Sequence, residues 1–364
     1  MSRTLLSALN VRRLRARHEA PLKRAACMFL HRFGALKPVS FVQWLATNRC
    51  NFRCCFCEAS AGDALADELS TDEAEALIDE LAAMGARLLI SGGEPLMRED
   101  LPRLLRYARK RRVSLGLVSN GYLVPSMWSD VRDIPWFLFF TSLDGTRAYH
   151  DQKRAPGSFD RVIKSLELFA GREVPLRIVN TVVHRENLAL LPALHTAVRA
   201  SRATRWHLTP AAPLGRNAAG GFGLDACGLD ELGGFLRAAA TTDGPRVVLG
   251  ESHGYLGPLL GVEGGKPFFC GAGLTRCSIL ADGTVLGCQQ VYDRRLAEGN
   301  VREQPLGAIW RRGFKRFRPR ALPSSCAGCP QAHCCAGGCW AEMELRSRCL
   351  KATLDDASRA PGEG

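Results

Sequence analysis

The chain has 364 residues, of which 49 are lysine or arginine, 36 are aspartate or glutamate and 15 are cysteine. Its length suggests two packed units, and its 46% hydrophobic and 23% charged content is typical of a globular protein with a sizeable core. This composition excludes a mainly disordered or low-complexity chain. No stretch approaches the roughly 18 consecutive apolar residues of a spanning helix, so we expect no transmembrane segment.

The cysteines are the unusual feature of the composition. Fifteen are too few for a disulfide scaffold of this length, and an odd number cannot all pair within one chain. The N-terminus shows no apolar secretory core, and its resemblance to an organellar transit peptide is interrupted by Glu19 and Pro21. We therefore expect a cytoplasmic protein whose clustered cysteines hold metal.

The predicted elements begin after a basic N-terminal extension, residues 1–38, in which leucines and arginines alternate as in an amphipathic helix. Such a helix either packs on a domain edge or contacts a peptide or membrane partner. From residue 39 onward, strands and helices alternate. The expected strands are Val39–Ala46, Arg87–Ser91, Val113–Ser119, Trp136–Ser142, Leu176–Val183 and Arg205–Ala211.

Helices are expected between these strands. Ser70 and Glu73 form a capping-box pattern that opens the first helix, and the others are expected around Leu101–Arg112, Asp160–Ala170 and Asn187–Arg199. Six strand–helix alternations with right-handed crossovers predict an α/β fold, a partial (β/α)6 TIM-like barrel over residues 39–215. Residues 216–269 are interpreted as a glycine- and alanine-rich bridge with one helix near Asp230–Ala240. A small cysteine-rich domain, residues 270–350, and a flexible tail, residues 351–364, complete the expected organisation.

The first cysteine cluster follows the first strand directly. Cys50, Cys54 and Cys57 have the spacing C-x3-C-x2-C, at the strand end where parallel α/β folds place their chemistry. Three thiolates on one loop can hold three irons of a [4Fe–4S] cluster and leave the fourth iron open to another ligand. Cys55 breaks the spacing and is interpreted as a neighbour. A zinc site completed by a distant residue is the alternative.

Further motifs after the next strands match those of radical S-adenosylmethionine (SAM) enzymes, which the chain resembles. Ser91-Gly92-Gly93-Glu94-Pro95 ends the second strand like the family's GGEP motif, and the later matches are Ser119-Asn120-Gly121, Ser142-Leu143-Asp144-Gly145 and Leu214-Gly215-Arg216. The resemblance implies that Gly92 and Gly93 let the backbone approach SAM and that Glu94 helps to hold its methionyl ammonium group. It implies ribose and carboxylate contacts for Ser119, Asn120, Ser142 and Asp144, and an adenine-side segment at Leu214 and Gly215.

The mechanism implied by the resemblance begins with SAM chelating the open iron through its amino and carboxylate groups. One-electron reduction then cleaves a C–S bond, and the 5′-deoxyadenosyl radical abstracts hydrogen from a substrate. Cys50, Cys54 and Cys57 would thus be both the metal ligands and the catalytic residues. The cofactor performs the difficult chemistry, and the barrel positions it and excludes water.

The second cysteine cluster resembles the SPASM domain of radical SAM enzymes, which carries two auxiliary [4Fe–4S] clusters. By position, the resemblance assigns one cluster to Cys270, Cys277, Cys288 and Cys339, and the other to Cys326, Cys329, Cys335 and Cys349. Cys277 has a counterpart in only some family members, and Cys334 would replace Cys335 if the loop slips by one residue. A zinc ribbon on Cys326 and Cys329 is the alternative. Cys27 and Cys227 lack partners at useful spacing and are interpreted as packing or surface residues.

The expected substrate is a ribosomally made peptide, because SPASM-bearing enzymes mostly modify peptides by crosslinking, epimerisation or oxidation. In the sulfatase-maturing branch an aspartate base stands where this chain has Gln289, which cannot take up a proton, so we do not expect that oxidation. Tyr292 and Asp293 lie close enough in sequence to substitute, although turn or packing roles are simpler. Oxidation or side-chain removal on a tetrapyrrole or other small molecule is the alternative, and a non-catalytic iron–sulfur electron carrier is the alternative outside enzymes.

The expected partners follow from the same resemblance and from charge. The formal net charge is +13, and a basic run from Arg311 to Arg320 precedes Cys326. This run either compensates the anionic clusters or docks an acidic leader peptide, and no recognition motif predicts nucleic-acid binding. About forty residues precede the first strand, which leaves no room for a winged-helix peptide-recognition domain, so a separate leader-binding protein is a possible partner. The electron donor is expected to be a flavodoxin or ferredoxin.

Overall fold

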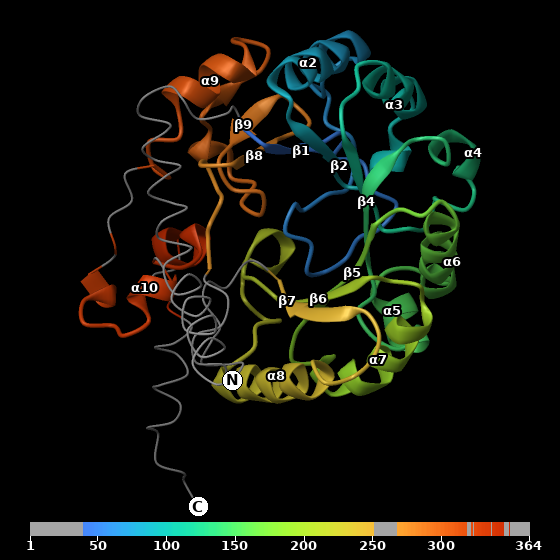
Figure 1. Ribbon diagram of the computed structural model, residues 1–364, viewed down its shortest axis with the longest axis vertical. Helices are drawn as coiled ribbons and strands as arrows, with labels where there is room; N and C mark the ends of the chain where they lie inside the picture. The colour runs from blue at the N-terminus through green and yellow to red at the C-terminus, as the bar shows by residue number, and fades with distance from the viewer. Residues whose placement is uncertain are drawn as a thin grey trace, which may run out of the picture.

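The computed structural model describes residues 39–250, 268–318, 322, 324–335, 337–345 and 349. The predicted N-terminal extension and C-terminal tail lie outside these residues. The central element of the described part is a ten-stranded sheet in the order β10-β9-β8-β1-β2-β3-β4-β5-β6-β7. The sheet ends at β10 on one side and β7 on the other, and it curls into an open partial barrel with the helices outside (Figure 1).

The first six strands fall where the sequence predicts them. They are β1 (Phe41–Leu45), β2 (Arg87–Ser91), β3 (Leu115–Val118), β4 (Trp136–Ser142), β5 (Leu176–Val183) and β6 (Arg205–Pro210). Each pairs in parallel with the next, which confirms the predicted α/β class. Their carboxyl ends therefore lie at one edge of the sheet, where a parallel α/β fold places its ligands.

Four strands were not expected from the sequence. In the segment interpreted as a bridge, β7 (Arg246–Leu249) pairs in parallel with β6, so the barrel sheet continues beyond residue 215. On the other side, β8 (Arg276–Ile279) pairs in parallel with β1, and β9 (Thr284–Leu286) and β10 (Gly299–Asn300) follow antiparallel. All four are short, with two to four residues, so no alternation of apolar and polar residues is long enough to predict them.

Most helices of the described part lie on the convex side of the sheet, and α10 lies apart from it (Figure 1). The helices are α2 (Thr71–Met84), α3 (Leu101–Lys110), α4 (Trp128–Val131), α5 (Arg147–Lys153), α6 (Ser158–Gly171), α7 (Leu191–Ala200), α8 (Ala226–Ala239), α9 (Leu306–Arg312) and α10 (Ala332–Cys335). The predicted capping box begins α2: the Ser70 hydroxyl accepts from the Glu73 amide, and the Glu73 carboxylate accepts from the Ser70 amide at 2.8 Å. Gly85, in the left-handed region at φ 64°, ends the same helix.

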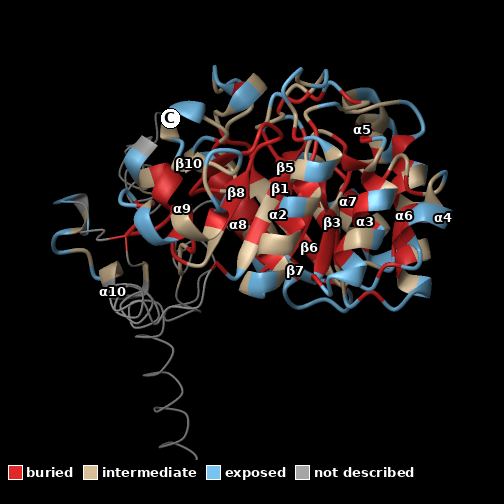
Figure 2. Cartoon of the chain, turned by 90° about the horizontal axis from the view of Figure 1, so that it is seen from above, coloured by how far each residue is buried: buried red, intermediate tan, exposed pale blue. Residues whose placement is uncertain are grey.

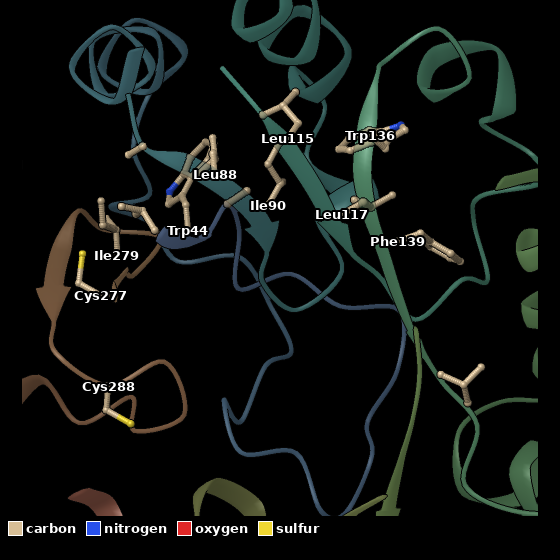
Figure 3. Close-up of a cluster of buried hydrophobic side chains, with 14 of the residues drawn as sticks. Trp44, Leu88, Ile90, Leu115, Leu117, Trp136, Phe139, Cys277, Ile279 and Cys288 are labelled. Atoms are coloured by element: carbon tan, nitrogen blue, oxygen red, sulfur yellow. The ribbon is translucent and has the colours of Figure 1, made fainter. Parts of the chain in front are cut away.

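The main core lies between the sheet and these helices. Side chains that alternate along the strands face it, including Trp44, Leu88, Ile90, Leu117 and Phe139 (Figure 3). The opposite face of the sheet carries a smaller cluster with Leu89, Leu138 and Ile178. Figure 2 shows buried residues throughout the sheet and exposed residues on the outer faces of the helices. Each large apolar side chain buried in this way stabilises the fold by about 1.5–3 kcal/mol. Within the described ranges, no helix is long and apolar enough to cross a membrane.

Candidate active site

The loop that carries the first three cysteines starts where β1 ends. The Cys50 amide donates to the Gly62 carbonyl at 2.8 Å, and this bond closes the loop on itself. Phe52, Cys54 and Phe56 form a buried cluster, and the thiols of Cys50 and Cys57 pack against it. None of the three cysteines is in a disulfide. The structure thus gathers Cys50, Cys54 and Cys57 at the carboxyl edge of the sheet, as the sequence predicts.

These thiols are close enough to influence one another. Burial raises the pKa of Cys50 to about 11, and the charges of Glu94, Cys54 and Cys57 add to this effect. Burial also raises the pKa of Cys54. Thiols held together in this way resist ionisation unless a cation binds them, which is the condition that a metal cluster satisfies. Among the described residues, no group of three or more histidine, cysteine or acidic side chains could hold a single metal ion. A cubane differs because it binds each thiolate through a different iron.

Glu94 lies next to these cysteines and is fully buried. Its carboxylate accepts from the Asn120 amide at 2.8 Å, from the Ser119 hydroxyl at 2.9 Å and from the Leu96 amide at 3.2 Å. All three donors are uncharged. Burial therefore raises the pKa of Glu94 to about 7, despite these hydrogen bonds. A buried carboxylate in such surroundings is suited to a cationic ligand, which would replace the lost hydration.

The glycines of the predicted SAM motifs pack against the cysteine loop itself. A Cβ on Gly92 would lie 2.5 Å from the Thr47 carbonyl oxygen, and one on Gly93 would lie 2.4 Å from that of Arg49. Gly215 has φ 54°, and a Cβ there would lie 2.3 Å from the Cys57 carbonyl oxygen. These positions need glycine because three segments of backbone meet there. The structure therefore gives them a role within the chain, in addition to any approach to a ligand.

Arg216 fastens the segment after β6 to the cysteine loop. Its guanidinium donates to the carbonyl of Cys54 at 2.7 Å and to that of Ala61, and its amide donates to the carbonyl of Cys57 at 3.0 Å. The segment Leu214-Gly215 thus lies directly beside Cys57. Pro95 is the first residue of a 3₁₀ turn, Pro95–Met97, that follows Glu94. Ser142 is the last residue of β4, and the Asn120 side chain donates to Asn51 on the cysteine loop at 2.7 Å.

Arg154 is the residue at this site that the sequence reasoning missed. It follows α5 and forms a buried ion pair with the Asp144 carboxylate, which also accepts from the Val182 amide at 3.1 Å. Burial opposes ionisation of Asp144, but the Arg154 guanidinium holds the pKa of that carboxyl below its ordinary value. Arg154 lies over the Phe56 ring at 5.4 Å, and its charge also acts on Cys54 and Cys57. Among so many arginines, nothing in the local sequence distinguishes this one.

The cysteines of the C-terminal region fall into two groups. Cys270, Cys288 and Cys339 lie close enough to act on one another electrostatically, whereas Cys277 lies in β8 and is completely buried. Cys326 and Cys329 lie in one turn, joined by a 3.1 Å backbone hydrogen bond, and Cys335 ends α10. The structure describes Cys349 but not the residues directly before and after it, and the side chain of Cys334 lies outside the described part. Cys227 is exposed on α8, and Cys27 lies in the undescribed extension.

The two candidates for replacing the missing base at Gln289 are placed differently. Asp293 lies at the surface, where it pairs with Arg295 at 2.7 Å. The Tyr292 hydroxyl lies inside, donating to the Gln289 carbonyl at 2.8 Å and accepting from the Gln43 side chain at 3.2 Å. Burial raises the pKa of Tyr292, to which the charges of Glu58, Cys57 and Cys288 also contribute. Tyr292 therefore lies between the first cysteine loop and Cys288, as a protonated hydrogen-bond donor.

Family models match both parts of the chain. The radical SAM superfamily model matches residues 44–194, and the SPASM iron–sulfur cluster-binding domain matches residues 270–330. The chain is 29% identical to the AdoMet-dependent heme synthase of Methanosarcina barkeri over 350 residues, covering 88% of this chain and 95% of that protein. It is 30% identical to the Fe-coproporphyrin III synthase of the same organism over 340 residues, covering 83% of this chain and 82% of that protein. It is also 30% identical to the mycofactocin maturase of Mycolicibacterium smegmatis over 310 residues, covering 82% of this chain and 77% of that protein.

Solved structures show the same fold. Streptococcus suis SuiB bound to S-adenosylmethionine superposes with a TM-score of 0.70 at 17% identity, over 90% of this chain and 79% of that one. A chain of anSMEcpe with bound AdoMet superposes with a TM-score of 0.65 at 18% identity, and the match covers 88% of this chain and 100% of that one. The fold and the site thus define an iron–sulfur enzyme of the partial-barrel type. The chain belongs to the radical SAM superfamily and carries a SPASM domain, which confirms both predicted resemblances.

Proposed function

We propose that the chain binds a [4Fe–4S] cluster on Cys50, Cys54 and Cys57, cleaves SAM reductively and modifies a ribosomally made peptide. The observation that carries this proposal is the three-thiol loop at the end of β1, packed beside the buried and uncompensated carboxylate of Glu94. When bound, the cluster supplies the electron that cleaves SAM to the radical that abstracts hydrogen from the substrate. The electron itself would come from a flavodoxin or ferredoxin, as the sequence predicts.

The residues around the loop would hold and orient SAM. Glu94 would accept hydrogen bonds from its amino group, and Ser119 and Asn120 keep the Glu94 carboxylate fixed. Arg154, held in place by Asp144, adds positive charge beside two of the thiolates and lies over the Phe56 ring. Leu214 and Gly215 would contact the adenine side, because Arg216 fixes their segment against Cys57. Ser142, at the end of β4, would reach the ribose.

A peptide is favoured as substrate by the cations around the site, which already have partners in the described part of the chain. Arg154 pairs with Asp144, Lys153 pairs with Glu186 at 2.6 Å, and Arg294 pairs with Asp282 at 2.7 Å. A tetrapyrrole with several carboxylates would have to compete for these arginines and lysines, whereas a neutral peptide backbone would not. The likeness to a mycofactocin maturase supports the same choice. An acidic leader peptide would bind to the exposed Arg311 and Arg312 at the end of α9. Alternatively, a separate leader-binding protein would bind the leader and deliver the peptide to the enzyme.

A tetrapyrrole is the second candidate because one observation favours it. The match to a heme synthase extends over 95% of that protein, so the two chains share nearly their whole architecture. Anaerobically reconstituted enzyme, dithionite and SAM would be incubated separately with Fe-coproporphyrin III and with any short peptide found to be encoded beside the gene. We expect 5′-deoxyadenosine and a substrate mass change with a peptide alone. Turnover of the tetrapyrrole alone would contradict the proposal, and intact SAM in every mixture would indicate an electron carrier.

A further inference from the structure

We propose that Asn180 and His207, on the concave face of β5 and β6, bind a backbone amide group of the substrate peptide, and that Thr209 orients the Asn180 side chain for this contact. This inference rests on the proposed function, because it assumes that the substrate is a peptide. Neither residue belongs to a cysteine cluster or to one of the predicted SAM motifs. Their position follows from the pairing of three neighbouring strands.

The two residues lie in one row across the sheet. Ser142, the last residue of β4, pairs with Asn180, and Asn180 pairs with His207. Because in-register neighbours in a sheet share a face, the three side chains lie side by side on the same face. Arg205 and Arg246 begin β6 and β7, so they lie at the amino edge of the sheet. The row lies closer to the carboxyl edge, where a parallel α/β fold binds its ligands.

This row is on the concave face of the sheet. The residues before and after Asn180 and His207 are completely buried, and three of them belong to the core under the helices: Val179, Thr181, Trp206 and Leu208. Because side chains alternate along a strand, Asn180 and His207 point away from the helices. The His207 ring lies edge-on to Phe140, at 5.8 Å, and Phe140 packs with the smaller apolar cluster of the concave face. Asn180 and His207 are only half-buried, so part of each side chain is open to a ligand.

The cysteine loop lies directly beyond this row. Val182, two residues after Asn180 and on the same face, packs against the buried cluster of the loop, to which Cys54 belongs. Two residues along a strand span about 7 Å. Figure 1 shows the segment after β1, in blue, on the concave side of the sheet. A peptide bound to Asn180 would therefore lie close to the place where the radical would form.

The hydrogen bond from Thr209 determines which group Asn180 offers to a ligand. The Thr209 hydroxyl donates to the Oδ1 atom of Asn180 at 2.7 Å. This bond holds the side-chain carbonyl toward Thr209 and directs the NH2 group away from it. The NH2 group donates to no acceptor in the described part of the chain. Asn180 therefore presents a hydrogen-bond donor to the concave side of the sheet.

A peptide group suits the combination of Asn180 and His207. It has one acceptor, its carbonyl oxygen, and one donor, its N–H group, and the two side chains supply a donor and, in a neutral imidazole, an acceptor. Phe140 offers apolar surface beside them for a side chain of the same peptide. A site that combines apolar surface with a few fixed polar groups selects its ligand by requiring each hydrogen bond.

The contact is tested by the kinetics of three variants of the full-length, reconstituted enzyme, with any short peptide found to be encoded beside the gene as the substrate. Asn180→Leu should lower kcat/KM for the peptide by about 5- to 100-fold, because a bound carbonyl loses its donor. His207→Phe keeps a ring beside Phe140 and should also lower kcat/KM. Thr209→Val removes only the orienting hydrogen bond and should have a smaller effect.

Iron content, SAM affinity and SAM cleavage without peptide should stay at wild-type values in all three variants, which would show that they are folded. The ratio of 5′-deoxyadenosine to modified peptide should therefore rise, since the radical would form beside a misplaced substrate. The matched control is His195→Phe. His195 of α7 stacks on Trp206 at 5.5 Å from the helix side, so this change should leave the kinetics unchanged.

Wild-type kcat/KM in both Asn180→Leu and His207→Phe would overturn the inference. A loss of SAM affinity by the same factor as the loss of kcat/KM would also overturn it, because the two side chains would then hold SAM and not the peptide. No modification of a peptide by the wild-type enzyme would contradict the proposed function itself, and the inference with it. The wild-type reaction thus separates the two failures.

Discussion

Glu94 shows how one buried residue can define a ligand site. The carboxylate is fully buried, its hydrogen-bond donors are neutral, and its pKa is raised to about 7. The protein therefore bears the cost of burying this group without an internal cation to offset it. In a stable fold, such an arrangement is retained where a ligand makes use of it. The GGEP motif predicts the presence of this glutamate, and the structure adds its burial and its partners.

Replacing Glu94 by glutamine should weaken SAM binding by about 5- to 15-fold, because a charge-assisted hydrogen bond of about 1.5–3 kcal/mol becomes a neutral one of about 0.5–1.5 kcal/mol. Anaerobic equilibrium dialysis with labelled SAM would measure the change. The iron content should stay the same, since Glu94 is not expected to hold the cluster. Ser119→Ala, which removes one donor to the same carboxylate, is the matched control and should have a smaller effect. Unchanged SAM affinity in the glutamine variant would remove Glu94 from the binding site.

At the level of elements, one arginine connects the barrel to the C-terminal region. Arg302 follows β10 and donates to Glu73 in the first turn of α2, at 2.7 and 3.0 Å. It also donates to the backbone carbonyls of Asp67, Glu68 and Asp282. One side chain thus joins the loop before α2 to the turn between β8 and β9. This network stabilises the position of the C-terminal hairpin relative to the barrel.

Arg302→Ala should lower the free energy of unfolding by about 1–2 kcal/mol, since several bonds to carbonyl groups are lost together with a partly exposed ion pair. Thermal unfolding would measure it. The ion-pair part depends on pH: the hydrogen bond from Arg302 lowers the pKa of Glu73 from 4.5 to about 2. This stabilisation is complete above pH 4.5 and disappears as the pH falls toward 2. Arg295→Ala, whose partner Asp293 is two residues away, is the control and should leave the melting temperature unchanged. Equal effects of the two substitutions would contradict the bridging role.

The elements also show what the sequence could and could not predict. Segments rich in β-branched residues, such as Leu176–Val183, were sufficient to predict a parallel strand, and the capping box at Ser70 gave the start of α2. The strand β8 has four residues beside a cysteine cluster, where periodicity gives no signal. Without that strand there is no register, and without the register the face on which Cys277 lies cannot be predicted. Arg154 was missed for a related reason, because its pairing with Asp144 depends on the path of the turn and of α5, which separate the two residues.

On the scale of the whole molecule, the barrel and the C-terminal region share one sheet. Because β8 continues the sheet beside β1, the loop that leaves β1 with Cys50 lies next to the hairpin that leads to Cys288. Both cysteine groups therefore border the same edge of the barrel. The basic run that begins at the end of α9 divides accordingly: Arg311, Arg312, Lys315 and Arg316 are exposed, whereas Arg318 is buried in the core. The exposed part of the run is available for a partner, and Arg318 has a packing role.

The central claim is that three cysteines on one loop hold the cluster that cleaves SAM. The most direct measurement compares iron content and 5′-deoxyadenosine release, after anaerobic reconstitution and dithionite reduction, in Cys54→Ala and in Cys55→Ala. Both substitutions remove one thiol from the same loop, where Cys54 belongs to the buried cluster and Cys55 packs against it. We predict that Cys54→Ala loses about four irons and all SAM cleavage, and that Cys55→Ala keeps both. Full iron content and SAM cleavage in Cys54→Ala, or equal losses in the two variants, would contradict the claim.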